Sequence, residues 1–184
     1  GVNYGVPSGE YGTLAVEVRS AAVVLQTNKQ GNKTWTRHSG DTGATWTDWV
    51  LNYHTGNILG TVSQSAGVPT GAVIEAGSNA NGSYTKFADG TMICHIEETR
   101  TLTITAATGS LFFSTVGQWT FPVSFSAVPS TNLEVANGNG RFLFFGSSNG
   151  TGVTTTYHNG QLMSPVSQAS ATYTLGRIAI GRWF

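Results

Sequence analysis

The chain has 184 residues, of which 24 are glycine, 39% are hydrophobic and only 10% are charged. A hydrophobic fraction of this size excludes disorder caused by charge repulsion. Nine basic residues balance nine acidic ones, so the formal net charge is zero, and the general electrostatic driving force for binding nucleic acid or an anionic membrane is absent. We therefore expect neutral or polar partners and no nucleic acid.

The hydrophobic runs are short. The longest, such as 21–25 and 142–145, fall far below the roughly 18 to 20 residues that a membrane span requires, so membrane insertion is not expected. The single cysteine, Cys94, permits neither a disulfide within the chain nor a cysteine-based zinc site. Because the sequence begins at Gly1 without a signal-like segment, we expect a fragment of a longer protein.

Segments rich in Thr, Val and aromatic residues, interrupted by Gly and Asn, predict strands and turns rather than helices. Residues 1–57 contain three of the five tryptophans and predict a small module whose core is marginal by itself, so it should lean on a neighbour or on a symmetry mate. Residues 58–76 form a low-charge connector with Gly and Pro. From 77 to 184, strand signals every 8 to 12 residues predict a β-sandwich.

Two hairpins are predicted in the larger segment. The first spans Tyr84–Ile96, where Asp89–Gly90 supplies two residues of positive φ for a tight turn. The second spans Thr154–Met163 and turns at Asn159–Gly160. Across 101–106, strict alternation places apolar residues on one face and threonines on the other, which predicts one buried face and one solvated face.

The stretch 37–50, which reads RHSGDTGATWTDWV, follows Gly12–Val16 and Gln26 in the sequence. This pattern resembles the small knob module of phage tail fibres and tail-like bacteriocins. Trp46 and Trp49 flank a predicted turn, and we expect both rings to fill a small core rather than contact a ligand.

Three further segments resemble the tip domains of phage tail fibres, which themselves resemble trimeric lectin sandwiches. In 76–95 the first hairpin reads tyrosine, basic residue, phenylalanine, Asp-Gly and then a strand, while 119–129 and 179–184 are similar to later parts of these tips. The resemblance implies an all-β chain with a small antiparallel knob module and an antiparallel β-sandwich tip, intertwined as a homotrimer. It also implies an upstream tail-fibre shaft and a place at the distal end of the fibre in the virion, after synthesis in the bacterial host cytoplasm.

An enzymatic function is not expected. Gly146–Gly150 matches the Gly-x-Ser-x-Gly pattern of hydrolases, but that motif requires a following helix and a strand is predicted here. Glycan cleavage requires two converging carboxylates, whereas Glu97 and Glu98 are adjacent on a predicted strand and point to opposite faces. The four histidines lack the spacing of metal ligands, so neither a metal nor another cofactor is expected.

The loops of the last fifty residues carry the candidate receptor site. Arg141 would donate paired hydrogen bonds, Tyr157 would offer an aromatic face, and His158 and Asn159 would read hydroxyl positions. These residues suit a bacterial surface polysaccharide or lipopolysaccharide. Tyr157 and His158 are consecutive on a predicted strand, so they should point to opposite faces. The alternative interpretation of this region is a set of ordinary turns in which Asn and Gly serve the backbone geometry.

Three functions remain open from the sequence. The first is an adhesin that recognises a host cell-surface glycan and mediates attachment. The second is a structural trimeric adaptor of the tail that carries another receptor binder, and the third is a glycan depolymerase. In each case Trp119 and Trp183 are expected to be structural, because both lie in apolar strand contexts.

Overall fold

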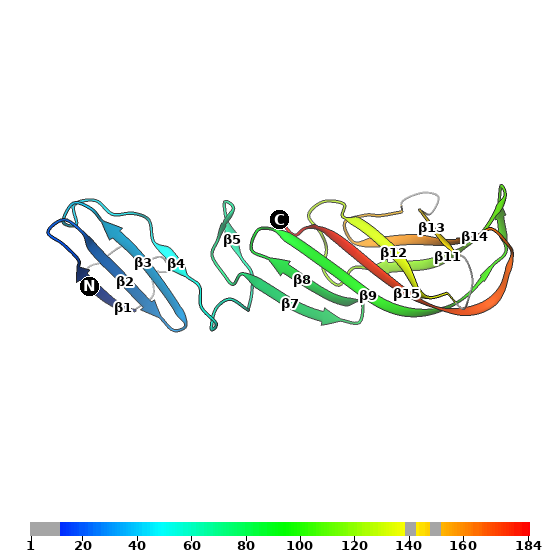
Figure 1. Ribbon diagram of the computed structural model, residues 1–184, viewed down its shortest axis with the longest axis horizontal. Helices are drawn as coiled ribbons and strands as arrows, with labels where there is room; N and C mark the ends of the chain where they lie inside the picture. The colour runs from blue at the N-terminus through cyan, green and yellow to red at the C-terminus, as the bar shows by residue number, and fades with distance from the viewer. Residues whose placement is uncertain (1–11, 139–142, 148–151) are drawn as a thin grey trace. The chain divides into compact units, whose positions relative to one another are not determined.

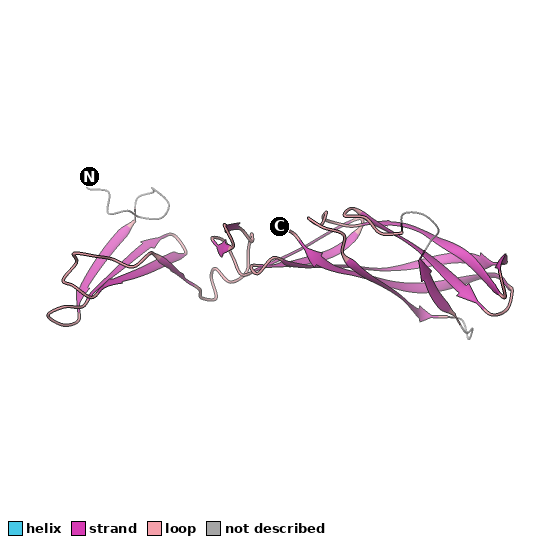
Figure 2. Cartoon of the chain, turned by 90° about the horizontal axis from the view of Figure 1, so that it is seen from above, coloured by secondary structure: helices cyan, strands magenta, loops and turns pink. Residues whose placement is uncertain are grey.

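The computed structural model describes residues 12–138, 143–147 and 152–184. Within these ranges every regular element is a strand, and the strands pair antiparallel within each sheet, which confirms the expected all-β class (Figures 1 and 2). No described segment forms a helix that is long and apolar enough to cross a membrane. The chain divides into two compact units, Gly1–Val73 and Ile74–Phe184. The domain boundaries proposed from the sequence are 1–57, 58–76 and 77–184. They remain predictions alongside this division into two units.

The first unit is built on a four-stranded sheet with the order β1-β2-β3-β4. Its strands are β1 (Thr13–Val18), β2 (Val24–Gln30), β3 (Lys33–Ser39) and β4 (Val50–Asn52), and a short hairpin adds β5 (Gln64–Ser65) and β6 (Val68–Pro69). Few apolar side chains are buried here, among them Trp35, Val62 and Ala72. The core of this unit is therefore small, as its length predicts.

The second unit is a sandwich of two antiparallel sheets, with the orders β12-β15-β9-β8-β7 and β10-β11-β14-β13. The strands are β7 (Ile74–Asn79), β8 (Gly82–Phe87), β9 (Thr91–Ile104), β10 (Ala106–Thr108), β11 (Leu111–Thr120), β12 (Ser130–Asn137), β13 (Phe144–Ser147), β14 (Tyr157–Ser164) and β15 (Gln168–Arg182). The two longest strands, β9 and β15, pair along most of their length and form the centre of the first sheet (Figure 1).

The core of the sandwich lies between the two sheets. Ile104, Leu162 and Leu175, from β9, β14 and β15, are fully buried in one cluster, and Trp119 belongs to a second cluster. The Trp119 ring packs edge-to-face on Phe121 with 5.0 Å between ring centroids. Alternating side chains from both sheets thus fill the interior, as the pattern of 101–106 predicts for Leu102 and Ile104. Ala106, expected on the same buried face, is exposed because β9 ends at Ile104 and Ala106 begins β10.

The tryptophans expected to be structural are both tied to backbone carbonyls of the second unit. The indole nitrogen of Trp119 donates to the carbonyl oxygen of Asn81 at 2.8 Å, and that of Trp183 donates to Phe87 at 2.8 Å. Trp119 is buried, whereas Trp183 is partly exposed near the end of the chain. Both contacts satisfy the one donor that an indole ring carries.

The hairpin between β8 and β9 turns at Asp89–Gly90, as predicted. Gly90 has a φ of 93°, and its amide donates to the carbonyl of Phe87 at 3.0 Å. Asp89, however, stays outside the left-handed region, and its carboxylate accepts from the Thr91 amide at 2.8 Å. One glycine with positive φ is therefore enough for this turn.

The predicted turn at Asn159–Gly160 is wrong. Both residues lie inside β14, where Asn159 pairs with Gln118 of β11 and Gly160 pairs with Ser147 of β13. Strands on both sides hold this segment extended, so the propensity of Asn-Gly for turns is overridden by tertiary pairing. The chain turns just before β14 instead, where the Thr154 hydroxyl accepts from the backbone amide of residue 156 at 3.1 Å.

Candidate functional site

The structure places three of the four predicted site residues at the start of β14. The side chain of His158 faces the interior and the residue is 7% exposed, whereas Tyr157 and Asn159 lie on the outer face of the sheet and are half-buried. Tyr157 and Asn159 are thus brought together, and His158 is separated from them. Arg141 lies outside the described residues. These three residues lie within β14, which continues through the turn predicted at Asn159–Gly160.

Tyr157 and Asn159 belong to a larger set of outward side chains on β11 and β14. We call this set the amide face; it consists of Gln118, Thr120, Tyr157, Asn159 and Gln161. Asn159 lies opposite Gln118 and Tyr157 lies opposite Thr120 in the strand register. The amide nitrogen of Gln118 donates to the hydroxyl of Thr120 at 3.2 Å. Side chains opposite each other in antiparallel strands lie about 5 Å apart at Cβ, so these five form one continuous surface.

The amide face is chemically suited to a neutral, hydroxyl-rich ligand. Each side-chain amide supplies two N–H donors and one carbonyl acceptor, and the threonine hydroxyl does both. Tyr157 adds an aromatic ring, against which the apolar side of a sugar ring can pack. None of the five side chains carries a charge at neutral pH.

Sequence reasoning missed three residues of this face, Gln118, Thr120 and Gln161. Gln161 could have been found from the sequence, because residues 157, 159 and 161 share one face of any continuous strand. The mistaken turn at Asn159–Gly160 concealed that pattern. Gln118 comes from a different strand, and its place opposite Asn159 depends on a register shift that no local pattern predicts.

The register shift lies in β11 between Thr115 and Gln118. Three positions separate these residues, a spacing that would place them on opposite faces of a regular strand. Both nevertheless pair with outward residues of β14, because a β-bulge inserts one extra residue and Gly117 adopts a φ of 83°. The bulge therefore aligns Gln118 with Asn159.

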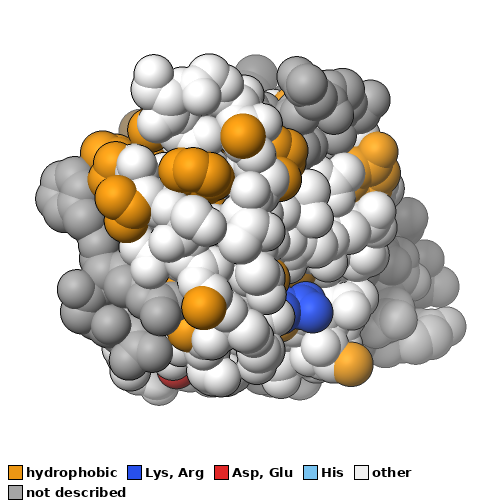
Figure 3. Space-filling model, turned by 90° about the vertical axis from the view of Figure 1, so that its right-hand side faces the viewer, with side chains coloured by type: hydrophobic (Ala, Val, Ile, Leu, Met, Phe, Trp, Pro, Cys, Tyr) orange, Lys and Arg blue, Asp and Glu red, His pale blue; other side chains and the backbone are white. Residues whose placement is uncertain are grey.

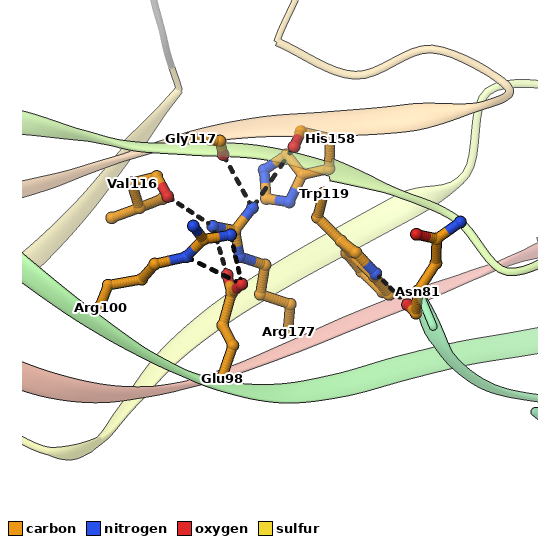
Figure 4. A network of polar contacts seen from close by, with 8 residues as sticks. All are labelled: Asn81, Glu98, Arg100, Val116, Gly117, Trp119, His158 and Arg177. Atoms are coloured by element: carbon orange, nitrogen blue, oxygen red, sulfur yellow. Dashed lines mark hydrogen bonds and ion pairs between the residues drawn. The ribbon is translucent and has the colours of Figure 1, made fainter. Parts of the chain in front are cut away.

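A buried arginine holds the bulge from inside the sandwich (Figure 4). The guanidinium of Arg177, on β15, donates to the carbonyl oxygens of Val116 and Gly117 at 3.0 Å each. Its contact with the carbonyl of His158 is longer, at 3.5 Å. Arg177 thus links β15 of one sheet to β11 and β14 of the other.

The charge of Arg177 is balanced by Glu98 on the neighbouring strand β9. The two side chains form an ion pair at 2.6 Å, and the side chain of Arg177 is fully buried. Arg100 donates to the other carboxylate oxygen of Glu98 at 2.6 and 2.9 Å. Burial lowers the pKa of Arg177 and Glu98 opposes this effect. Burial likewise lowers the pKa of His158, and the positive charge of Arg177 lowers it further, so both effects favour the neutral imidazole.

Figure 3, which views the structure from the right-hand side of Figure 1, shows scattered hydrophobic side chains and little basic or acidic surface among the described residues. The described residues also contain no group of three His, Cys, Asp or Glu side chains that could hold a metal ion. The chemistry available on this surface is that of neutral hydrogen bonding and apolar packing.

In the first unit, Asp41 organises the turn that follows β3. Its carboxylate accepts from the hydroxyls of Ser39 and Thr45 at 2.6 Å each and from the Thr45 amide at 2.8 Å. These hydrogen bonds, led by that of Ser39, lower the pKa of Asp41 from its ordinary 3.8 to about 2. The ordered turn lets the indole nitrogen of Trp46 donate to the carbonyl of Gly43 at 3.1 Å.

Trp46 and Trp49 do not fill an apolar core, contrary to expectation. Both are partly exposed and stack on the guanidinium of Arg37, whose central carbon lies 4.8 Å from one ring centroid and 4.5 Å from the other. Arg37 is held in turn by a 2.8 Å hydrogen bond to Gln26. The first unit has too few apolar side chains to bury both indole rings. A cation–π stack with Arg37 holds the rings in place instead.

No protein-family model matches this chain, and no curated protein matches it. Among solved structures, a C-terminal part of the R2 pyocin fibre of P. aeruginosa is 18% identical with a TM-score of 0.37; the match covers 93% of this chain and 56% of that one. An N-truncated R1-type pyocin tail fibre is 19% identical over 60% of this chain and 88% of that chain, with a TM-score of 0.39. An N-truncated R2-type fibre is 17% identical over 93% of this chain and 82% of that chain, with a TM-score of 0.35.

The chain is similar to tail fibres of R-type pyocins. These belong to the class of tail-like bacteriocins that the sequence resembles, and this chain spans about half the length of the R2 fibre fragment.

Proposed function

We propose that the chain is the receptor-binding part of a phage tail fibre or of a tail-like bacteriocin fibre, and that its amide face attaches to a neutral glycan of the bacterial surface. The observation that carries the proposal is the alignment of Tyr157, Asn159 and Gln118 on one outer sheet face. Planar amides that bond pairs of hydroxyls, together with an aromatic ring, are the groups that neutral saccharides require. The knob-like and tip-like sequence motifs supply the fibre context.

We propose binding without catalysis. Glu98 points into the sandwich, where Arg177 and Arg100 engage both of its oxygens, while the adjacent Glu97 is exposed on the opposite face of the sheet. This adjacent pair therefore cannot converge on one glycosidic bond. The function that fits these residues is adhesion to a polysaccharide or to lipopolysaccharide.

The proposed active form is a homotrimer at the distal end of the fibre, joined to an upstream shaft. Phe144, Phe145 and Ile180 are each more than 40% exposed, although large apolar side chains are normally buried. Neighbouring copies of the chain would cover such side chains. Three copies of a weak site on one particle would raise the apparent affinity through avidity.

The test combines mass and binding. Light scattering of the purified chain should give three times 19.4 kDa. The protein should also bind envelope polysaccharide extracted from a bacterium to which it adsorbs, without releasing reducing sugar. Binding to another tail protein with no binding to polysaccharide would favour the structural adaptor. Release of sugar would favour a depolymerase, and a stable folded monomer would contradict the trimer.

A further inference from the structure

The first unit contains a cavity of about 550 Å³, within the range of small-ligand sites. Its wall includes three aromatic residues, Trp35, Trp49 and Tyr53, and three polar ones, Lys33, Asp48 and Thr70. We propose that this cavity binds a hexopyranoside, as a second saccharide site that is separate from the amide face and does not depend on it.

The aromatic rings are held in place without a ligand. Trp49 stacks on Arg37, which does not line the cavity, so the cavity meets the indole on a side that the cation leaves open. The hydroxyl of Tyr53 donates to the carbonyl of Gly71 at 3.2 Å, which fixes its half-exposed ring at the cavity edge. Trp35 is 8% exposed and forms part of the floor. Rings fixed in this way offer apolar surface to the C–H face of a pyranose at little entropic cost.

The polar residues of the wall supply the contacts that hydroxyl groups need. Lys33 donates, the carboxylate of Asp48 accepts, and Thr70 can do both. The Thr70 hydroxyl is oriented by a 2.9 Å hydrogen bond with Ser63. A saccharide presents an apolar ring face and flanking hydroxyls together, which matches aromatic walls flanked by polar groups.

A second copy of the chain is a less suitable occupant. The cores of subunit interfaces are depleted in Lys and Asp, because burying these charges against an apolar surface is costly. Here Lys33 and Asp48 stand beside the aromatic rings on the same wall. A ligand rich in hydroxyls can solvate both charged groups on binding.

Trp46 provides a matched control for Trp49. Both indoles stack on the same guanidinium, of Arg37, but only Trp49 lines the cavity. Replacing either tryptophan removes one cation–π contact with Arg37, and Trp46→Ala also removes the hydrogen bond to Gly43. A difference in ligand binding between Trp46→Ala and Trp49→Ala therefore reports the cavity rather than the stability of the unit.

For the test, the full chain is labelled with 5-fluorotryptophan. It is then titrated with methyl β-D-glucopyranoside and, separately, with methyl β-D-galactopyranoside, and binding is followed by ¹⁹F NMR. We expect the Trp49 resonance to shift saturably with at least one glycoside, and the affinity to fall at least tenfold in Trp49→Ala. Asp48→Ala, at an exposed position, should weaken binding with an unchanged melting temperature. Trp46→Ala should retain the affinity, and Tyr157→Ala, which removes the aromatic ring of the amide face, shows whether any of the signal comes from that face.

Several results would overturn the proposed second site. These are an unmoved Trp49 resonance with both glycosides, an equal loss of affinity in Trp46→Ala, and a changed assembly mass in Trp49→Ala, which would mean that another copy covers the cavity. Loss of binding in Tyr157→Ala would assign the signal to the amide face instead. Tyr157→Ala changes only the amide face, so it distinguishes the two sites. If the second saccharide site fails this test, the proposed receptor function is still tested separately by mass and polysaccharide binding.

Discussion

The guanidinium of Arg177 donates to the carbonyl oxygen of Val116 at 3.0 Å across the interior of the sandwich. Val116 lies in the bulge of β11, where its carbonyl has left the regular ladder of β11 with β14. Arg177 therefore replaces the hydrogen bonds that the bulge forfeits, and this bulge brings Gln118 opposite Asn159. The outer surface proposed to bind glycan depends in this way on a charge buried beneath it.

Removing Arg177 should be far more damaging than removing Arg100, although both bind Glu98. Arg177→Ala leaves a carboxylate and two carbonyls without their buried donor, at a cost of about 3 to 5 kcal/mol in the free energy of unfolding. The side chain of Arg100 is 42% exposed, so Arg100→Ala should cost about 1 kcal/mol or less. Urea denaturation of both variants checks this, and equal losses would contradict the role given to Arg177.

Trp119 should contribute more to stability than Trp183. Trp119→Ala empties a buried position beside Phe121, so it should lower the free energy of unfolding by about 3 to 5 kcal/mol. Trp183 is partly exposed, so Trp183→Ala should lower it by about 1 to 2 kcal/mol. Thermal unfolding of the two variants measures the difference. A Trp119→Ala protein with an unchanged melting temperature would show that this ring is not part of the core.

The fold class and the turn at Asp89–Gly90 could be read from the sequence, because period-two alternation and a glycine after Asp are local signals. The strand through Asn159–Gly160 could not, since pairing on both sides outweighs the local preference for a turn. The burial of Arg177 could not be predicted from the sequence either. Its partners lie on three other strands, and nothing near it in sequence distinguishes a buried arginine from an exposed one.

For the candidate site, the sequence predicts Tyr157, His158 and Asn159 at a turn, whereas the structure holds all three in β14 and presents Tyr157 and Asn159 on one sheet face. The opposite orientation of Tyr157 and His158 follows from the sequence, because consecutive residues of a strand face opposite ways, and the structure confirms it. The cation–π stack around Arg37 was missed because Trp46 and Trp49 were assigned to a core that this unit is too small to form.

The turn built on Asp41 should stay ordered well below the usual pKa of a carboxylate. The folded-state pKa is depressed to about 2, so the stabilisation from ionised Asp41 is fully present above about pH 4 and is lost as the pH falls through 2. The chemical shift of the Trp46 indole, bonded to Gly43, should report this transition. Asp41→Asn should abolish it, and a midpoint near pH 4 in the wild type would contradict the hydrogen bonds to Ser39 and Thr45.

Cys94 should be unreactive until the second unit unfolds. Its side chain is fully buried in the sandwich core, and burial raises the pKa of the thiol to about 11. Since the thiolate is the reactive form, a thiol reagent at pH 8 should modify the protein only in denaturant. Rapid labelling of the native chain would mean that the two sheets separate readily around this residue.

Variants of the amide face test the proposed receptor site most directly. The measurement is the adsorption of the labelled chain to bacteria that the wild type binds, with assembly mass and melting temperature recorded for each variant. Tyr157→Ala and Gln161→Ala should each reduce the affinity about tenfold, or about 1.4 kcal/mol per site, without a change of mass. Asn132→Ala, an exposed amide on the outer face of the other sheet, should bind as the wild type does. Full adsorption by both amide-face variants would contradict the proposed receptor site.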